Sequence, residues 1–389
     1  MEEPDTDFFE NQRLAADDTS SAAVASLERQ ASLALSGAAE ADRADLQEIV
    51  RYLRSGVAHN SEGRDLGVAK SSFSTTELRV AARLEPERRV PYLLYRYRFN
   101  AYPRKRHLAR MPIMLAVEPT SVCNIKCVMC FQEDPALSRT RSMQGFMDLA
   151  LYERIISEAA DKGVGGIVLA SRGEPLLHKQ IVQFVRIAKD AGIIDVKLNT
   201  NATRLTEQMS RDLLASGLDT LVFSVDSAVK EQFEQIRVGA KFDRIVDNIE
   251  RFHAIRAAEF PDAPTRTRIS MVLLDRKQDT ETAVEFWRGM VDEFAVRWAI
   301  PRLNIYDQGV HEGQRPCSLL WERLYIWWDG VVNTCDEDYL SKLQIGKLAV
   351  ENGPTIEELW SGEAMRRYRA THAASRKASL LPCASCPGF

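Results

Sequence analysis

The stretch "IMLAVEPTSVCNIKCVMC" (residues 113–130) joins a short apolar run to three cysteines in the spacing CxxxCxxC. The run "IMLAVE" (113–118) has the length and composition of a buried strand, so the cysteine loop is expected to follow a strand directly. Three thiols are one short of the four ligands that close a structural metal site. The stretch therefore predicts a metal centre with one open coordination position.

Cys123, Cys127 and Cys130 carry soft thiolate ligands, which bind zinc, copper(I) and iron-sulfur clusters. They can hold three irons of a [4Fe-4S] cluster and leave the fourth iron for a substrate or cofactor. The segment "MEEPDTDFFENQRLAADD" (1–18) has neither the basic region nor the apolar core of a signal peptide, and no run of eighteen apolar residues follows. We therefore expect a cytoplasmic protein that does not span a membrane and whose seven cysteines are metal ligands or redox groups.

The composition, 45% hydrophobic and 27% charged over 389 residues, allows one large domain and a smaller one. A formal net charge of −4 gives no reason to expect nucleic acid as a partner. Residues 1–75 are expected to form a weakly ordered arm, with a helical segment from Ala22 to Leu53 and a loop at "HNSEGRDLG" (59–67).

Residues 76–112 are expected to form a basic and aromatic lead-in segment to the main domain. Its stretch "RRVPYLLYRYRFNAYPRKRHLAR" (88–110) interleaves cations with aromatic residues. This pattern favours aromatic rings packed on the next domain with solvated cations. The alternative is a surface that grips phosphates, an anionic lipid surface or single-stranded nucleic acid.

From residue 113 the chain alternates short β-branched runs with longer amphipathic helical patterns. Further strands are expected at "GGIVLAS" (165–171), "DVKLNT" (195–200), "DTLVFSV" (219–225), "RISMVLL" (268–274) and near "RLNIY" (302–306). Helical patterns between them include "LALYERIISEAADKG" (149–163) and "HKQIVQFVRIAKDAG" (178–192), the second closed by a glycine that suits a helix stop. The repeat predicts an α/β fold, a partial (βα)6 parallel barrel over residues 113–310.

Polar motifs follow four of these strands. They are the cysteine loop, "SRGEP" (171–175), "NTNAT" (199–203) and "SVDS" (224–227). Because the carboxyl ends of parallel strands form one face, the four motifs are expected to meet at one mouth.

The combination of "CNIKCVMC" after one strand and "SRGEP" after the next resembles the radical S-adenosylmethionine (SAM) enzymes over residues 110–310. The resemblance implies that SAM binds the open iron of a [4Fe-4S] cluster. One electron from an external donor such as flavodoxin or ferredoxin then cleaves SAM to methionine and a 5'-deoxyadenosyl radical, which abstracts hydrogen from the substrate.

The resemblance also assigns roles to individual residues. It makes Cys123, Cys127 and Cys130 the cluster ligands, and it places Gly173 and the Glu174 carboxylate where the family's GGEP stretch receives the SAM amino group. By the same comparison Ser224, Asn199 and Asn201 contact SAM, and Arg237 pairs with the SAM carboxylate or with a surface acid. Arg172 replaces the first glycine of GGEP, and Met129 stands where an aromatic residue often precedes the third cysteine.

The C-terminal segment holds the other four cysteines, Cys317, Cys335, Cys383 and Cys386. Four thiolates close a tetrahedral site, so the residues alone allow a structural zinc or a fully ligated iron-sulfur cluster. The spacing of Cys317, Gly330 and Cys335 is similar to the start of SPASM and twitch domains. That similarity implies a twitch-like domain over residues 311–389 with one auxiliary [4Fe-4S] cluster, and structural zinc stays the alternative.

The number of cysteines bears on the reaction. An epimerase that quenches its substrate radical with a cysteine would need an eighth thiol, and the two groups of three and four use all seven. An oxidation instead needs an electron acceptor, which an auxiliary cluster supplies, and a base, for which "CDEDY" offers Asp336, Glu337 and Asp338. The layout resembles twitch dehydrogenases of aminocyclitols. It implies a radical SAM oxidoreductase that acts on a small molecule, a sugar or aminocyclitol, and the basic stretch suits a nucleotide- or lipid-linked sugar.

Two other functions stay open at this point. One is a radical SAM maturase that modifies a peptide. The other belongs to a different class, a non-catalytic zinc-binding or redox-sensing protein, against which the open three-cysteine site argues.

Overall fold

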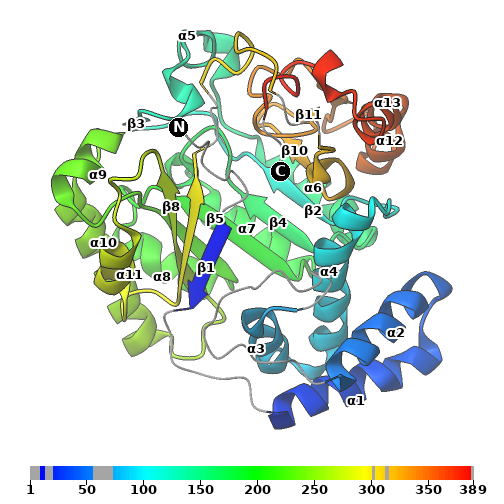
Figure 1. Cartoon of the computed structure of the whole chain (residues 1–389). Coiled ribbons are helices and arrows are strands. Elements are labelled where there is room, and N and C mark those ends of the chain that lie inside the picture. Colours follow the sequence, from blue (N-terminus) through cyan, green and yellow to red (C-terminus); the bar gives the residue numbers. More distant parts are fainter. Residues whose placement is uncertain (1–8, 14–20, 56–72, 300–302, 312–314, 387–389) are drawn as a thin grey trace. The chain divides into compact units, whose positions relative to one another are not determined.

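The computed structural model describes residues 9–13, 21–55, 73–299, 303–311 and 315–386 (Figure 1). The chain divides into two compact units, one of residues Ala15–Ala109 and one of Met1–Leu14 with Arg110–Phe389. In the part of the chain that is described, no helix is both long enough and apolar enough to cross a membrane.

The unit of residues 15–109 is helical. Its helices are α1 (Ser21–Gly37), α2 (Glu40–Arg54), α3 (Thr75–Arg83) and α4 (Pro86–Lys105). The helical segment expected from residue 22 to 53 is thus two helices with a break at residues 38–39, and the loop expected at 59–67 lies outside the described residues. The expected domain boundaries at residues 75 and 112 stay a prediction.

Helix α4 contains most of the basic and aromatic stretch, and its tyrosines at 92, 95 and 97 are buried. Two of its cations are paired with acids of the same unit. Arg96 lies 2.6 Å from Glu77, and Arg98 contacts Asp42 at 2.5 Å and Asp45 at 2.8 Å. These two arginines therefore form ion pairs inside the unit.

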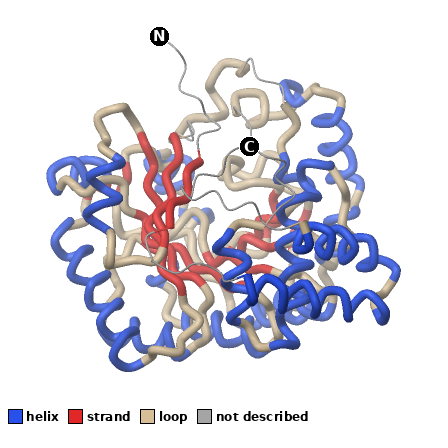
Figure 2. Tube along the Cα trace, turned by 60° about the horizontal axis from the view of Figure 1, so that its bottom comes forward, coloured by secondary structure: helices blue, strands red, loops and turns tan. Residues whose placement is uncertain are grey.

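The other unit contains the expected barrel. Six parallel neighbours form it: β2 (Met114–Val117), β4 (Gly166–Leu169), β5 (Asp195–Thr200), β6 (Thr220–Ser224), β8 (Arg266–Leu273) and β9 (Glu293–Trp298). The helices that follow these strands are α6 (Leu149–Asp161), α7 (Ile181–Asp190), α8 (Glu207–Ala215), α9 (Lys230–Ile236), α10 (Phe242–Glu259) and α11 (Thr280–Trp287). They cover the outside of the curved sheet (Figure 1, Figure 2). The partial (βα)6 barrel is confirmed.

The main core lies between the sheet and these helices. Alternate strand residues such as Leu115, Val117, Val196 and Leu198 pack into it, as the pleat of a strand requires. Helix α7 ends as its glycine predicted, because Gly192 adopts a φ of +90° that favours glycine at a helix stop.

The sixth strand was expected near residues 302–306, and this expectation is wrong. The sixth strand is β9 in "EFAVRW", and residues 303–306 form turns. Ile305 is fully buried in a small cluster with Phe131, Leu137 and Tyr339. The apolar residues of "RLNIY" therefore serve packing between loops, a use that periodicity alone does not separate from a strand.

The barrel sheet continues into the C-terminal residues. Strand β10 (Arg323–Ile326) pairs parallel with β2, and β11 (Val331–Asn333) and β12 (Gly346–Lys347) extend the sheet beyond it. Helices α12 (Ile356–Ser361) and α13 (Glu363–Ala373) follow. At the other edge, β1 (Phe9–Arg13) pairs antiparallel with β9. The barrel and the C-terminal region therefore share one sheet.

Short elements complete the loops. They are β3 (Lys126–Cys127), β7 (Arg237–Val238), α5 (Pro135–Ser138) and the 3₁₀ helices η1 (Phe131–Glu133), η2 (Arg141–Met143), η3 (Pro175–Leu177), η4 (Ser318–Trp321) and η5 (Lys377–Ser379).

Candidate active site

The three-cysteine loop leaves the carboxyl end of β2, and its strand β3 pairs with β7 so that Cys127 lies opposite Arg237. Cys123, Cys127 and Cys130 are partly buried and close enough together to perturb one another's ionisation. Burial raises the pKa of Cys123 to about 12. Three soft donors on one loop fit a [4Fe-4S] cluster with one iron left open.

The stretch "RGEP" packs directly against the base of this loop. A Cβ on Gly173 would lie 2.3 Å from the carbonyl oxygen of Thr120 and 2.6 Å from that of Val122, so only glycine fits there. The next residue, Glu174, donates its backbone N–H to the Val122 carbonyl at 2.9 Å. The loop that follows β4 is thereby held against the loop that follows β2.

The Glu174 carboxylate is 3% exposed and accepts three hydrogen bonds. The donors are the Thr200 hydroxyl at 2.6 Å, the Asn201 N–H at 2.7 Å and the Leu176 N–H at 3.0 Å. Burial raises the pKa of this carboxyl, and the three hydrogen bonds oppose that rise. Glu174 thus ties the end of β4 to the end of β5, and its expected contact with the SAM amino group stays a prediction.

Polar side chains at the ends of β4 and β5 have spare hydrogen-bonding capacity. Within the described residues, Asn199 Oδ1 and Ser171 Oγ are buried and have no hydrogen-bond partner. The Asn201 side chain donates to Asn124 Oδ1 at 3.1 Å and lies 3.9 Å from Cys123 Sγ. Buried polar atoms normally find partners, so this arrangement fits a polar ligand such as SAM.

The remaining expected SAM contacts lie at the same strand ends. Ser224 ends β6 and is half-buried. Arg237 forms a buried ion pair with Asp226 of "SVDS" at 2.8 Å, and its Nη1 donates to Cys127 Sγ at 3.7 Å. Arg237 therefore pairs with a buried acid rather than a surface acid. Contacts of Ser224 and Arg237 with SAM stay predictions.

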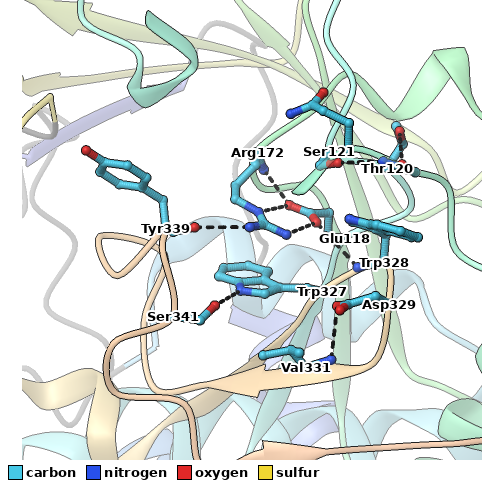
Figure 3. A network of polar contacts seen from close by, with 12 residues as sticks. Glu118, Thr120, Ser121, Arg172, Trp327, Trp328, Asp329, Val331, Tyr339 and Ser341 are labelled. Atoms are coloured by element: carbon cyan, nitrogen blue, oxygen red, sulfur yellow. Dashed lines mark hydrogen bonds and ion pairs between the residues drawn. The ribbon is translucent and has the colours of Figure 1, made fainter. Parts of the chain in front are cut away.

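Arg172, which departs from the family pattern, forms a buried ion pair with Glu118 at the end of β2 (Figure 3). Its guanidinium donates to Glu118 Oε2 at 2.7 Å and Oε1 at 2.6 Å, and the two side chains are 2% and 0% exposed. It also donates to the Tyr339 carbonyl at 3.0 Å and lies 4.3 Å from the centroid of the Trp327 ring. The pair therefore joins the "RGEP" loop to the C-terminal region, a role that no sequence motif indicated.

The four C-terminal cysteines also gather. Cys386 is buried and Cys317, Cys335 and Cys383 are partly buried, and none forms a disulfide. Burial raises the pKa of Cys335 well above its usual range, and Cys317 and Cys383 lie close enough to add to the rise. Cys386 acts on both Cys317 and Cys383 in the same way. Four converging thiols fit a closed centre with a full set of protein ligands.

Among the described residues, no group of three or more His, Cys, Asp or Glu side chains converges tightly enough to hold a single metal ion. A [4Fe-4S] cluster makes a different demand, because each thiolate binds a different iron of the cube.

The three candidate bases differ in their surroundings. The Asp338 carboxylate accepts hydrogen bonds from the Leu343 N–H at 2.6 Å, the Lys342 N–H at 2.9 Å and the Tyr306 hydroxyl at 2.9 Å. Burial raises the pKa of Asp338 to about 6. Glu337 is fully buried, and Asp336 is half-buried. Asp338 thus closes a turn, and the choice of a base among the three stays a prediction.

The architecture has recognisable relatives. The family model "Radical SAM superfamily" matches residues 117–284, and the model "Iron-sulfur cluster-binding domain" (SPASM) matches residues 317–387. Among solved structures, BtrN in complex with AdoMet and 2-DOIA superposes with a TM-score of 0.50 at 19% identity, over 72% of this chain and 94% of that one. SuiB of Streptococcus suis bound to precursor peptide SuiA gives 0.55 at 16% identity, over 89% and 82%. These two likenesses concern the fold.

Curated relatives match over shorter stretches. GTP 3',8-cyclase of Chlorobaculum tepidum is 35% identical over 136 residues, which is 35% of this chain and 39% of that protein. AdoMet-dependent heme synthase of Methanosarcina barkeri is 32% identical over 155 residues, which is 40% of this chain and 42% of that protein. The matches thus span about two fifths of each relative's length. On the motifs, the barrel and both family models, the chain belongs to the radical SAM superfamily, with a SAM-binding [4Fe-4S] cluster and a C-terminal SPASM-type domain for an auxiliary iron-sulfur cluster.

Proposed function

We propose that this radical SAM enzyme oxidises a small molecule, a sugar or aminocyclitol, with the auxiliary cluster as electron acceptor. When bound, the first cluster and SAM supply a radical that removes one hydrogen atom from the substrate, at the cost of one electron from an external donor. The auxiliary cluster, which the four C-terminal cysteines would hold, would supply an acceptor for the second electron, and a base of the chain would take up the proton. Asp336, Glu337 and Asp338 are the candidates for that base.

One observation carries this proposal: the four C-terminal thiols gather on the continuation of the barrel sheet, and the other three cysteines of the chain lie in the CxxxCxxC loop. Cys335 follows β11, which joins β2 of the barrel through β10. All seven cysteines of the chain belong to the two groups, so none is left to return a hydrogen atom to a substrate radical. Electron removal is then the outcome that the protein side chains favour.

The solved relatives support the choice of substrate only by likeness of fold. BtrN was solved with AdoMet and 2-DOIA and is covered almost completely by this chain. SuiB was solved with a precursor peptide and matches a larger part of this chain. A peptide-modifying radical SAM maturase is therefore the second candidate, and the GTP 3',8-cyclases add a third kind of substrate. A cytoplasmic location and a flavodoxin or ferredoxin as electron donor belong to the same proposal.

Iron and sulfide analysis of the anaerobically purified protein tests the cofactor content that the proposal needs. We expect about eight irons in the intact protein and about four when Cys123, Cys127 and Cys130 are all changed to alanine. About four irons plus one zinc, with the zinc retained in the variant, would remove the electron acceptor and with it the oxidation.

A single substitution tests the SAM-binding cluster. Cys127→Ala is expected to abolish reductive SAM cleavage, because the variant lacks one of the three thiolates that would hold the cluster in the loop. Release of 5'-deoxyadenosine under dithionite, measured by chromatography, is the readout. Cys383→Ala is the matched control, since it removes a thiol from the other site and should leave SAM cleavage measurable. Unchanged cleavage by Cys127→Ala would contradict the radical SAM assignment of this loop.

Substrate class is tested by product analysis. Sugars, aminocyclitols and peptides are incubated separately with enzyme, SAM and reductant. The amount of 5'-deoxyadenosine formed is then compared with the amount of product. A product two hydrogen atoms lighter than a small-molecule substrate supports the proposal. If only a peptide is converted, the protein is a peptide-modifying maturase and the proposed oxidation of a small molecule is wrong.

A further inference from the structure

Lys377, in η5, is among the largest fully buried side chains, with 1% of its surface exposed. Lysine is almost never fully buried unless it is paired. Its Nζ donates to the carbonyl oxygen of Cys386 at 2.9 Å, and in the described part of the chain no carboxylate lies within ion-pair distance of it. A buried cation without a carboxylate partner needs another source of negative charge.

The groups around Lys377 belong to the auxiliary site. Lys377 lies close enough to Cys317 for its charge to act on that thiol. Lys377 lies within the same kind of reach of Cys383. Lys377 thus lies near the thiols of Cys317 and Cys383 and is hydrogen-bonded to the backbone of Cys386.

His372 is buried and contacts the same site through the backbone of Cys317. Its Nδ1 accepts the backbone N–H of Cys317 at 3.2 Å.

From this placement we infer that Lys377 is the buried counter-ion of the auxiliary iron-sulfur cluster and raises its reduction potential. The inference rests on the proposed function, in which that cluster receives the electron of the substrate. Reduction adds one negative charge to the cluster, and a fixed cation in a buried, weakly polarisable site stabilises the reduced form more than the oxidised form. Lys377 thereby makes electron removal from the substrate more favourable.

The sign of the effect follows from the charge. A neutral side chain at position 377 withdraws stabilisation from the reduced form, so the potential of the auxiliary cluster should become more negative. Lys377→Gln retains a donor for the Cys386 carbonyl and loses the charge, whereas Lys377→Met loses both. Lys377→Arg retains the charge and should restore most of the potential.

The test is a redox titration of the full-length reconstituted protein, followed by electron paramagnetic resonance. The alanine substitutions at 123, 127 and 130 serve as background, so that the reduced signal belongs to the auxiliary site. Lys377→Gln and Lys377→Met should both shift the midpoint to more negative potential relative to the parent. Lys347→Met is the matched control, because it removes the same charge from an exposed position of the same domain, and it should leave the midpoint unchanged.

The outcomes separate this inference from the proposed function. A bound zinc, or no iron, in the parent would overturn both. An intact auxiliary cluster whose midpoint is the same in the parent, Gln and Met proteins would overturn the role of Lys377 and leave the proposed oxidation standing. Loss of the cluster in both neutral variants, with retention in Lys377→Arg, would make Lys377 a residue for assembly and would likewise overturn its redox role.

Discussion

Arg172→Met is expected to lower the free energy of unfolding by about 3–5 kcal/mol, because it leaves the buried Glu118 carboxylate without its counter-charge. Glu118 is fully buried, and Arg172 supplies two of its hydrogen bonds through the guanidinium. The substitution also removes the donor to the Tyr339 carbonyl. Urea denaturation followed by tryptophan fluorescence measures the loss, and Trp327 lies against the guanidinium as a local probe.

Two controls distinguish charge from general disruption. The double variant Glu118→Leu with Arg172→Met removes both charges and should recover much of the stability, because a buried ion pair is often replaceable by apolar side chains. Arg211→Met breaks an exposed pair of salt bridges, with Glu207 and Glu259, and should leave the urea midpoint nearly unchanged. A single Arg172→Met variant as stable as the parent would contradict the structural role of the pair. Arg172→Gly, which restores the glycine typical of the family, should also be destabilising in this chain.

Gly173→Ala is expected to weaken SAM binding by about tenfold or more. The added Cβ would lie 2.3 Å and 2.6 Å from two backbone carbonyl oxygens, so the "RGEP" loop must move away from the cysteine loop. Overpacking of this kind costs about 1–3 kcal/mol. About 1.4 kcal/mol corresponds to one factor of ten in affinity. Equilibrium dialysis of SAM against the reconstituted protein measures the change.

Gly309→Ala is the matched control, because a Cβ at position 309 meets nothing within 4 Å. It should bind SAM as the parent does. Tight SAM binding by Gly173→Ala would show that the contact between the two loops does not shape the SAM site.

Five of the six barrel strands were predictable because each is either a compact apolar run or an alternation of apolar and polar residues. Burial of β2 and β4 along their whole length explains their unbroken hydrophobic runs. The sixth strand was misplaced because Glu293 and Arg297 dilute the apolar signal of β9, whereas Ile305 lends "RLNIY" a strand-like composition. Strand β1 carries the polar sequence "FENQR" and gave no signal at all.

At the site, the two cysteine groups were predictable because ligand spacing is a local property of the chain. The partners of Arg172 and Lys377 were not, because they depend on contacts distant in sequence or on burial. Glu118 lies 54 positions before Arg172, and Tyr339 lies 167 positions after it. From the sequence, Arg172 is only a departure from the family pattern. In the structure it is paired with Glu118.

The parallel pairing of β10 with β2 has a consequence for how this enzyme can be divided or recombined. Residues 323–326 cover one edge of β2, whose other edge is paired with β4. A fragment that ended before β10 would expose four backbone positions of an apolar strand to water and to other molecules, which invites aggregation. A chimera that takes its C-terminal domain from a relative must therefore include β10 and keep its register with β2. The barrel and the C-terminal region share one sheet, so a cut near residue 310 would divide that sheet between two fragments.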